Sequence, residues 1–262
     1  MTNTTTFTIL KMGDVEVWTN GNLTISSLSL KPSSISSKLL THSSSDASTL
    51  LVNVWVDQIE NHATHLFSFS EGQVSFHLCR FNSITLTSTS AILVSGTASL
   101  DMNQVWFSHV TSSTTTSGSC VDARTSSSIT IISSDAAHCS SSGPAGVFHF
   151  TRLDNNPLTL TDIVFTSNLA SSSHAKHGND IVLVNYPPKF LSVTSSVKSI
   201  SQKPRVLIDG DEVEIQIPDY GYHSYGINHP LNHGFYLAVP MSQFPGIKLT
   251  IQDLVSPGSL AC

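Results

Sequence analysis

The chain has 262 residues, a formal net charge of −6 at pH 7 and only 11% charged residues. The acidic balance and the absence of any run of Lys or Arg exclude a nucleic-acid-binding protein, because phosphate backbones require clustered basic side chains. No apolar run approaches the roughly eighteen residues that a membrane-spanning helix needs. Apolar residues make up 39% of the chain, which is enough for a continuous core.

The N-terminal part of the chain predicts strands separated by turns. Residues 14–30 read as a first rung with a turn at Asn20-Gly21, a pair that tolerates positive φ. Residues 31–49 are Ser-rich and predict a loop or an irregular cap, after which residues 50–56 resume a strand. Residues 1–18 lack the charged and apolar regions of a secretory signal, so we expect either a cytosolic protein or a segment of a longer product.

The stretch from residue 82 to residue 185 repeats one short phrase at nearly constant intervals. In its clearest copy, apolar Leu158, Leu160 and Phe165 occupy phrase positions 0, +2 and +7, and Asn168 occupies position +10. Earlier copies, the nearest two at steps of 29 residues, begin at Ile129, Leu100, Val74, Val52 and Leu23, with Phe107 and Phe81 at position +7 of the second and third of these. A period of roughly 20 to 50 residues is typical of a solenoid, and alternation at 0 and +2 is typical of a strand.

This periodicity predicts an all-β solenoid of about six or seven turns, in which parallel strands stack about 4.8 Å apart. We assign residues 1–194 to the solenoid. The character of the chain changes at Tyr186-Pro187-Pro188, and residues 206–208 and 212–217 predict a hairpin around an Asp-Gly turn. The open end of a solenoid has to be covered, so residues 195–262 predict a C-terminal β cap or small β domain.

Three motifs in the repeats resemble known families. Phe165-Thr-Ser-Asn168 fits the F-x-x-N motif of the polymorphic outer membrane protein repeats, and residues 143–148 look like a degraded form of their Gly-Gly-Ala-Ile motif. Residues 177–182 look like the Gly-Asn-Asp-Ile/Val phrase that is common in pectin-lyase-like repeat proteins. The resemblance covers about residues 70–185 and implies a single-stranded right-handed parallel β-helix, often found in surface adhesins. It therefore also implies an extracellular or cell-surface location.

The polar residues of the repeats give little support to catalysis. Enzymes that cleave polysaccharides need converging carboxylates, and the repeat aspartates share no phrase position on adjacent turns. These aspartates are Asp101, Asp122, Asp135, Asp154 and Asp162. We therefore predict no catalytic residue. His109 and His138 both fall at position +9, so their side chains are predicted to stack, and without further ligands we expect an exposed pair that binds no metal.

The most site-like stretch outside the repeats is residues 220–234, rich in Tyr, Gly, His and Asn. Gly, Asn and Pro explain it as turns, but exposed tyrosines also suit the binding of sugars or proteins. The candidate binding residues are Tyr220, Tyr222, His223 and Tyr225. His223, His229 and His233 are weak candidates for a metal site, because their spacing matches no defined ligand motif. We predict no metal.

The four cysteines also predict no site. They follow no zinc-like spacing and occupy unrelated phrase positions, at Cys79, Cys120, Cys139 and Cys262. We expect buried or free thiols, because Cys packs as a small apolar residue. No other motif in the chain predicts a cofactor.

The sequence thus predicts a non-catalytic, surface-type β-helix scaffold, adhesin-like, whose Ser/Thr-covered faces bind a glycan or a protein. Two alternatives stay open: a polysaccharide lyase or hydrolase of the pectin-lyase-like class, and a truncated copy without independent function. Carboxylates gathered in one groove would favour the enzyme. A smooth face without such a cluster would favour the adhesin. The ligand and the oligomeric state are left unassigned.

Overall fold

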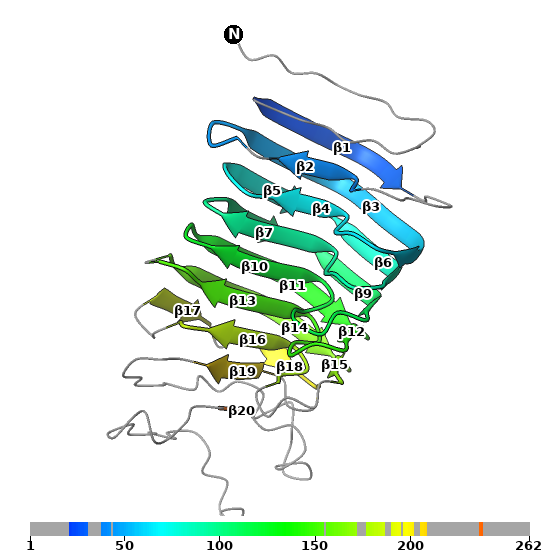
Figure 1. Cartoon of the computed structure of the whole chain (residues 1–262), viewed down its shortest axis with the longest axis vertical. Helices are drawn as coiled ribbons and strands as arrows, with labels where there is room; N and C mark the ends of the chain where they lie inside the picture. The colour runs from blue at the N-terminus through cyan, green and yellow to red at the C-terminus, as the bar shows by residue number, and fades with distance from the viewer. Residues whose placement is uncertain are drawn as a thin grey trace, which may run out of the picture.

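The computed structural model describes residues 21–30, 38–42, 44–154, 156–171, 177–186, 190–194, 196–201, 205–208 and 236–237. Across these residues every named element is a β-strand, and every strand pair is parallel. The strands stack into a right-handed parallel β-helix, as expected (Figure 1). The part of the chain that the structure describes contains no helix long and apolar enough to cross a membrane.

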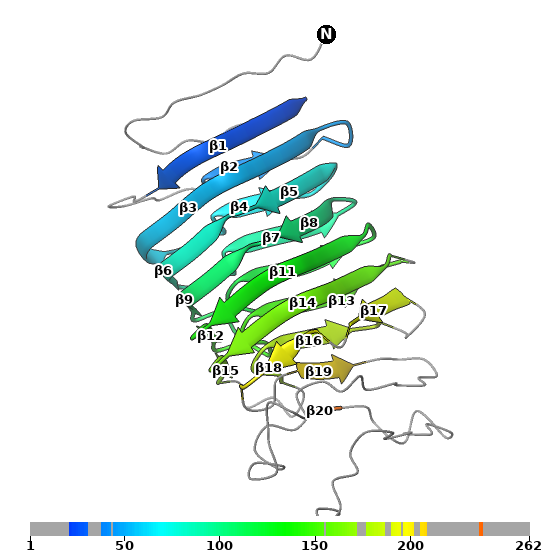
Figure 2. The same ribbon diagram turned by 180° about the vertical axis from the view of Figure 1, so that it is seen from behind.

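The strands belong to two sheets that run the length of the coil on opposite sides (Figures 1 and 2). The 12-stranded sheet contains β1 (Asn22–Leu30), β3 (Ser48–His62), β5 (Gln73–His77), β6 (Arg80–Leu86), β8 (Ser99–Asn103), β9 (Trp106–Ser112), β11 (Ile129–Ala137), β12 (Ser140–Ser141), β14 (Leu158–Thr166), β15 (Leu169–Ala170), β17 (Leu191–Val193) and β18 (Lys198–Ser199). The 8-stranded sheet contains β2 (Leu40–His42), β4 (Phe67–Phe69), β7 (Ile92–Gly96), β10 (Val121–Thr125), β13 (Phe148–Arg152), β16 (Ile181–Val184), β19 (Arg205–Ile208) and β20 (Tyr236–Leu237).

Each turn crosses the 12-stranded sheet and returns through the 8-stranded sheet. About five turns are complete, beginning at β3, β5, β8, β11 and β14, with shorter pieces at either end. At the C-terminal end, β19 pairs in parallel with β16, so the parallel strand pairing of the coil continues past residue 194. The predicted partner strand at residues 212–217 and most of the predicted cap at 195–262 lie outside the described residues.

The register of the strands confirms most of the predicted phrase alignment. Leu158 pairs with Ile129, Ile129 with Leu100, and Leu100 with Val74. The copy placed at Val52 is wrong by three residues, because Val74 pairs with Thr49. The error arises because the phrase was defined by apolar residues, and Thr49 is polar although it is buried. Its hydroxyl group lies 3.4 Å from the Nδ1 atom of His42.

Two columns of left-handed residues shape the 12-stranded sheet. Here a column means the equivalent position on successive turns. The first column contains Ser27, Asn53, Leu78, Gln104, Ser133 and Asp162, and the second contains Gln58, Ser83, His109, His138 and Ser167. All eleven have φ between 49° and 56°. A left-handed residue breaks the strict in-and-out alternation of a strand, so the next inward side chain comes three residues later instead of two.

This break explains the phrase itself. In β14 the buried apolar positions are Leu158, Leu160, Ile163 and Phe165, and the step of three spans the left-handed Asp162. The next step of three spans Ser167 and brings Asn168 inward. The F-x-x-N motif therefore consists of two inward-facing residues, Phe165 and Asn168, separated by a step of three residues because a left-handed residue lies between them.

The inward residues of all turns form one continuous core. All six residues assigned to the repeat are buried, namely Phe81, Phe107, Leu158, Leu160, Phe165 and Asn168. The rings of Phe81 and Phe107 stack with centroids 4.9 Å apart, and Phe148 contacts both Phe107 and Phe165 edge to face. Burying each such ring contributes roughly 1.5 to 3 kcal/mol. The described cysteines Cys79, Cys120 and Cys139 are buried free thiols in the same core, as predicted.

Asn168 lies in a buried polar network where the 12-stranded sheet meets the 8-stranded sheet. Its Oδ1 accepts a hydrogen bond from the Cys139 amide at 2.9 Å, and its Nδ2 donates to Asp180 Oδ1 at 2.8 Å. Ser199 also donates to the Asp180 carboxyl group. Complete burial raises the pKa of Asp180 to about 7, despite these donors and a further hydrogen bond from Ser201. The Asp of the Gly-Asn-Asp phrase thus links three segments of the chain through buried hydrogen bonds to Asn168 and Ser199.

We expect the burial of Asp180 to make stability fall as pH rises from about 4 to about 7. In that window the folded protein keeps a proton on Asp180 that the unfolded chain has released, so the free energy of unfolding decreases with pH, by on the order of 3 to 4 kcal/mol in all. Denaturant unfolding of the wild type and Asp180→Asn at several pH values measures the difference. Asp46→Asn, at an exposed site, is the control. A constant difference between wild type and Asp180→Asn would contradict the expectation.

Leu78 is the residue least suited to its left-handed position, with φ of 56° and 43% of its surface exposed. Asn tolerates this conformation, whereas a β-branched residue is strongly disfavoured there. We expect Leu78→Asn to raise the free energy of unfolding by about 0.5 to 1 kcal/mol and Leu78→Val to lower it. Denaturant unfolding curves compare the two variants. Equal effects of Asn and Val would show that the bend does not govern this position.

Candidate functional site

The residues predicted from sequence to bind ligands cannot be placed from the part of the chain that the structure describes. Tyr220, Tyr222, His223, Tyr225, His229 and His233 all lie outside the described residues. The binding and metal roles suggested for them therefore stay predictions. Within the described residues, no group of three or more His, Cys, Asp or Glu side chains is placed to hold a metal ion.

His109 and His138 stack as their shared phrase position predicts. Their ring centroids lie 5.0 Å apart with an interplanar angle of 27°. The Oγ atom of Ser108 lies 2.8 Å from Nδ1 of His109 and fixes the orientation of that ring. Ser83 and Ser167 occupy the same column on the neighbouring turns, so the pair is bounded on both sides by hydroxyl groups.

The repeat aspartates are more clustered than the phrase positions suggest. Asp122 is buried on the 8-stranded sheet, where it contacts Nδ1 of His149 at 3.0 Å and the guanidinium of Arg124 at 3.1 Å. On the 12-stranded sheet, Asp135 and Asp162 come from adjacent turns and interact. Partial burial, followed by the negative charge of Asp162, raises the pKa of Asp135. Phrase positions miss this pair because its members sit diagonally, two residues apart along neighbouring strands.

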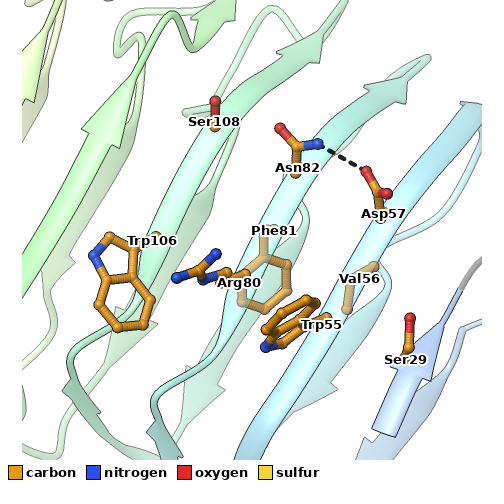
Figure 3. A pocket seen from close by; sticks show the side chains of 9 residues that line it. All are labelled: Ser29, Trp55, Val56, Asp57, Arg80, Phe81, Asn82, Trp106 and Ser108. Atoms are coloured by element: carbon orange, nitrogen blue, oxygen red, sulfur yellow. Dashed lines mark hydrogen bonds between the residues drawn. The ribbon is translucent and has the colours of Figure 1, made fainter.

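A groove of about 710 Å³ opens on the outward face of the 12-stranded sheet (Figure 3). It crosses strands β1, β3, β6 and β9, so it runs along the axis of the coil. Its lining consists of Ser29, Trp55, Val56, Asp57, Arg80, Phe81, Asn82, Trp106 and Ser108. The outward-facing members form two columns, one aromatic and basic, the other polar.

The first column of the groove places Arg80 between two tryptophans. Trp55 pairs with Arg80 and Arg80 pairs with Trp106, one residue from each of three successive turns. The guanidinium carbon of Arg80 lies 5.0 Å from the ring centroid of each indole (Figure 3). Each such contact contributes about 0.5 to 1 kcal/mol at an exposed site. No carboxylate among the described residues forms an ion pair with Arg80.

Both tryptophans are held in place from outside the stack. Trp55 Nε1 donates to Oδ1 of Asn53 at 3.1 Å, while the ring stays 45% exposed. Ser29, a residue with a small side chain, is the neighbour of Trp55 on the side away from Arg80 (Figure 3). At the other end of the column, the Trp106 side chain hydrogen-bonds to Asp135.

The second column of the groove presents polar groups beside the indoles. Asp57, Asn82 and Ser108 pair across β3, β6 and β9. Asn82 Nδ2 donates to Asp57 Oδ1 at 2.8 Å, which leaves the amide oxygen on the side away from Asp57 (Figure 3). Carboxylate, amide and hydroxyl groups together offer both acceptors and donors to a polar ligand.

Sequence reasoning missed this groove because of the register error at β3. Trp106 and Arg80 both occupy phrase position +6, whereas the wrong alignment put Trp55 at +3. With Thr49 as the start of the phrase, Trp55 also falls at +6 and the Trp-Arg-Trp column becomes visible. The signal was therefore present in the spacing, and the buried threonine concealed it.

No known protein family, curated protein or solved structure matches this chain.

Proposed function

We propose that the protein is a non-catalytic β-helix scaffold that binds a glycan in the groove of the 12-stranded sheet. The Trp-Arg-Trp column carries this proposal. Exposed indole faces beside hydrogen-bonding groups suit a sugar, which has an apolar ring face and a rim of hydroxyl groups. The groove follows the axis of the coil, and this direction fits an extended chain of sugars.

The strand register positions the backbone of each column member, and each tryptophan has a hydrogen-bond partner, Asn53 for Trp55 and Asp135 for Trp106. Ligands bind more tightly to side chains that do not have to be ordered on binding. The resemblance of the F-x-x-N motif to adhesin repeats supports the same role, and an extracellular or cell-surface location is part of the proposal.

Glycoside cleavage is a second candidate function, favoured by the Asp135 and Asp162 pair at the end of the groove column. Glycosidases use two carboxyl groups, one of which keeps its proton as a general acid. The raised pKa of Asp135 suits that acid. If the protein is an enzyme, Asp135→Asn abolishes the release of reducing sugar from a bound glycan. Binding without turnover by the wild type supports the scaffold.

We expect Trp55→Ala and Trp106→Ala each to weaken glycan binding by about tenfold or more, because a buried aromatic contact at a binding site contributes more than about 1 kcal/mol. Val164→Ala is the matched control. Val164 lies in the same column and is 41% exposed, but it is three turns from Arg80 and outside the lining of the groove.

A glycan array with the purified protein, followed by calorimetric titration of the bound glycans, measures these changes. Thermal unfolding verifies that each variant is folded. Glycan binding that survives both tryptophan substitutions would place the binding site elsewhere. Binding to no glycan would contradict the proposed function.

A further inference from the structure

The charges around the groove are arranged unevenly. Arg80 is the single cation among the nine residues that line it. Carboxylates surround it on the same outward face: Asp57 belongs to the polar column, Asp135 follows Trp106 in the Trp-Arg-Trp column, and Asp162 interacts with Asp135 from the next turn. Arg80 therefore lies between carboxylates along the outward face, with Asp57 on the turn before it and Asp135 two turns after it.

From this arrangement we infer that the groove selects glycans with an isolated anionic group, a carboxylate or a sulfate, flanked by neutral sugars, and that Arg80 is the residue that recognises the anion. The inference rests on the proposed glycan binding and specifies its ligand. It differs from affinity for polyanions, which a groove with several cations would favour.

The geometry of Arg80 favours an anion as its partner. A guanidinium carries its N–H donors in the plane of the group, and the guanidinium of Arg80 lies between the two indoles, with its carbon over each ring (Figure 3). An oxyanion can then accept two parallel hydrogen bonds from the in-plane donors. Arg80 forms no ion pair with any carboxylate among the described residues. None of these carboxylates therefore takes the place of the ligand's anion beside the guanidinium.

The surrounding carboxylates limit how much negative charge the ligand can carry. Successive anionic sugars in a polyanion would bring further charges toward the Asp135 and Asp162 pair. Like charges repel each other, so this repulsion weakens the binding of a polyanion more than the binding of a glycan with one anionic group. Neutral flanking sugars avoid the repulsion and still contact the exposed part of the Trp55 ring.

The test is an array of matched glycans, titrated afterwards in solution. The sets are lactose, 3′-sialyllactose and 3′-sulfated lactose, together with other neutral cores in neutral, singly carboxylated and singly sulfated forms, and oligomers of galacturonic acid as polyanions. We expect a single anion to strengthen binding roughly tenfold or more over the neutral core. The carboxylated and sulfated arms show which anion is preferred.

Arg80→Gln and Arg80→Lys separate recognition of the anion from support of the groove. We expect Arg80→Gln to lose the preference for the anion, so that its affinity ratio between anionic and neutral glycans falls to about one. We expect Arg80→Lys to retain part of the preference, because Lys keeps the charge without the planar donor edge. A Gln variant that loses neutral and anionic ligands alike would make Arg80 a positioning residue for the tryptophans and overturn the inference.

The remaining outcomes distinguish the inference from the function on which it rests. Equal binding of neutral and singly charged glycans by the wild type would overturn the inference and leave the glycan-binding proposal standing. Tightest binding to oligogalacturonate would do the same. Binding to no glycan in the array would overturn both.

Discussion

The left-handed residues at two equivalent positions of each turn are the constraint on which the rest of this structure depends. A parallel β-helix has to turn its chain while every backbone group stays paired with the turn above and below. Residues such as Ser83 and Ser133 achieve this inside the 12-stranded sheet, at φ near 50°, without a wide loop. Because the bends stack, the register between turns is preserved, and one turn determines where the side chains of the next will lie.

Stacking converts sequence position into surface chemistry. Inward columns become a continuous ladder of Phe, Leu and Ile, and outward columns align side chains of different types at the spacing of the strands. A pair such as His109 and His138 is an unavoidable product of this geometry, so stacking alone does not mark a site. The Trp-Arg-Trp column differs in two ways. Arg80 lies between two indoles and contacts both, and all three residues line a groove.

The fold was predictable from the sequence because it depends on a repeated spacing of apolar residues. This spacing is visible in the sequence without knowledge of side-chain contacts. The groove was not predicted, since its detection required the correct register at β3, and that register depends on a buried polar residue, Thr49. The Asp135 and Asp162 pair escaped for a related reason. Their contact is diagonal, so it depends on how far two side chains lean across adjacent turns, and phrase positions do not report that.

The location of the groove follows from the same geometry. Between the two bends of the 12-stranded sheet the ordinary strand alternation holds, so β3 presents Trp55 and Asp57 outward while Val54 and Val56 stay buried. On the 8-stranded sheet the strands are short and His149 and Asp122 are themselves buried. The outward face of the 12-stranded sheet is therefore the polar and aromatic surface on which the proposed groove lies. Arg80 is central to that surface because the two neighbouring turns both supply an indole at its position.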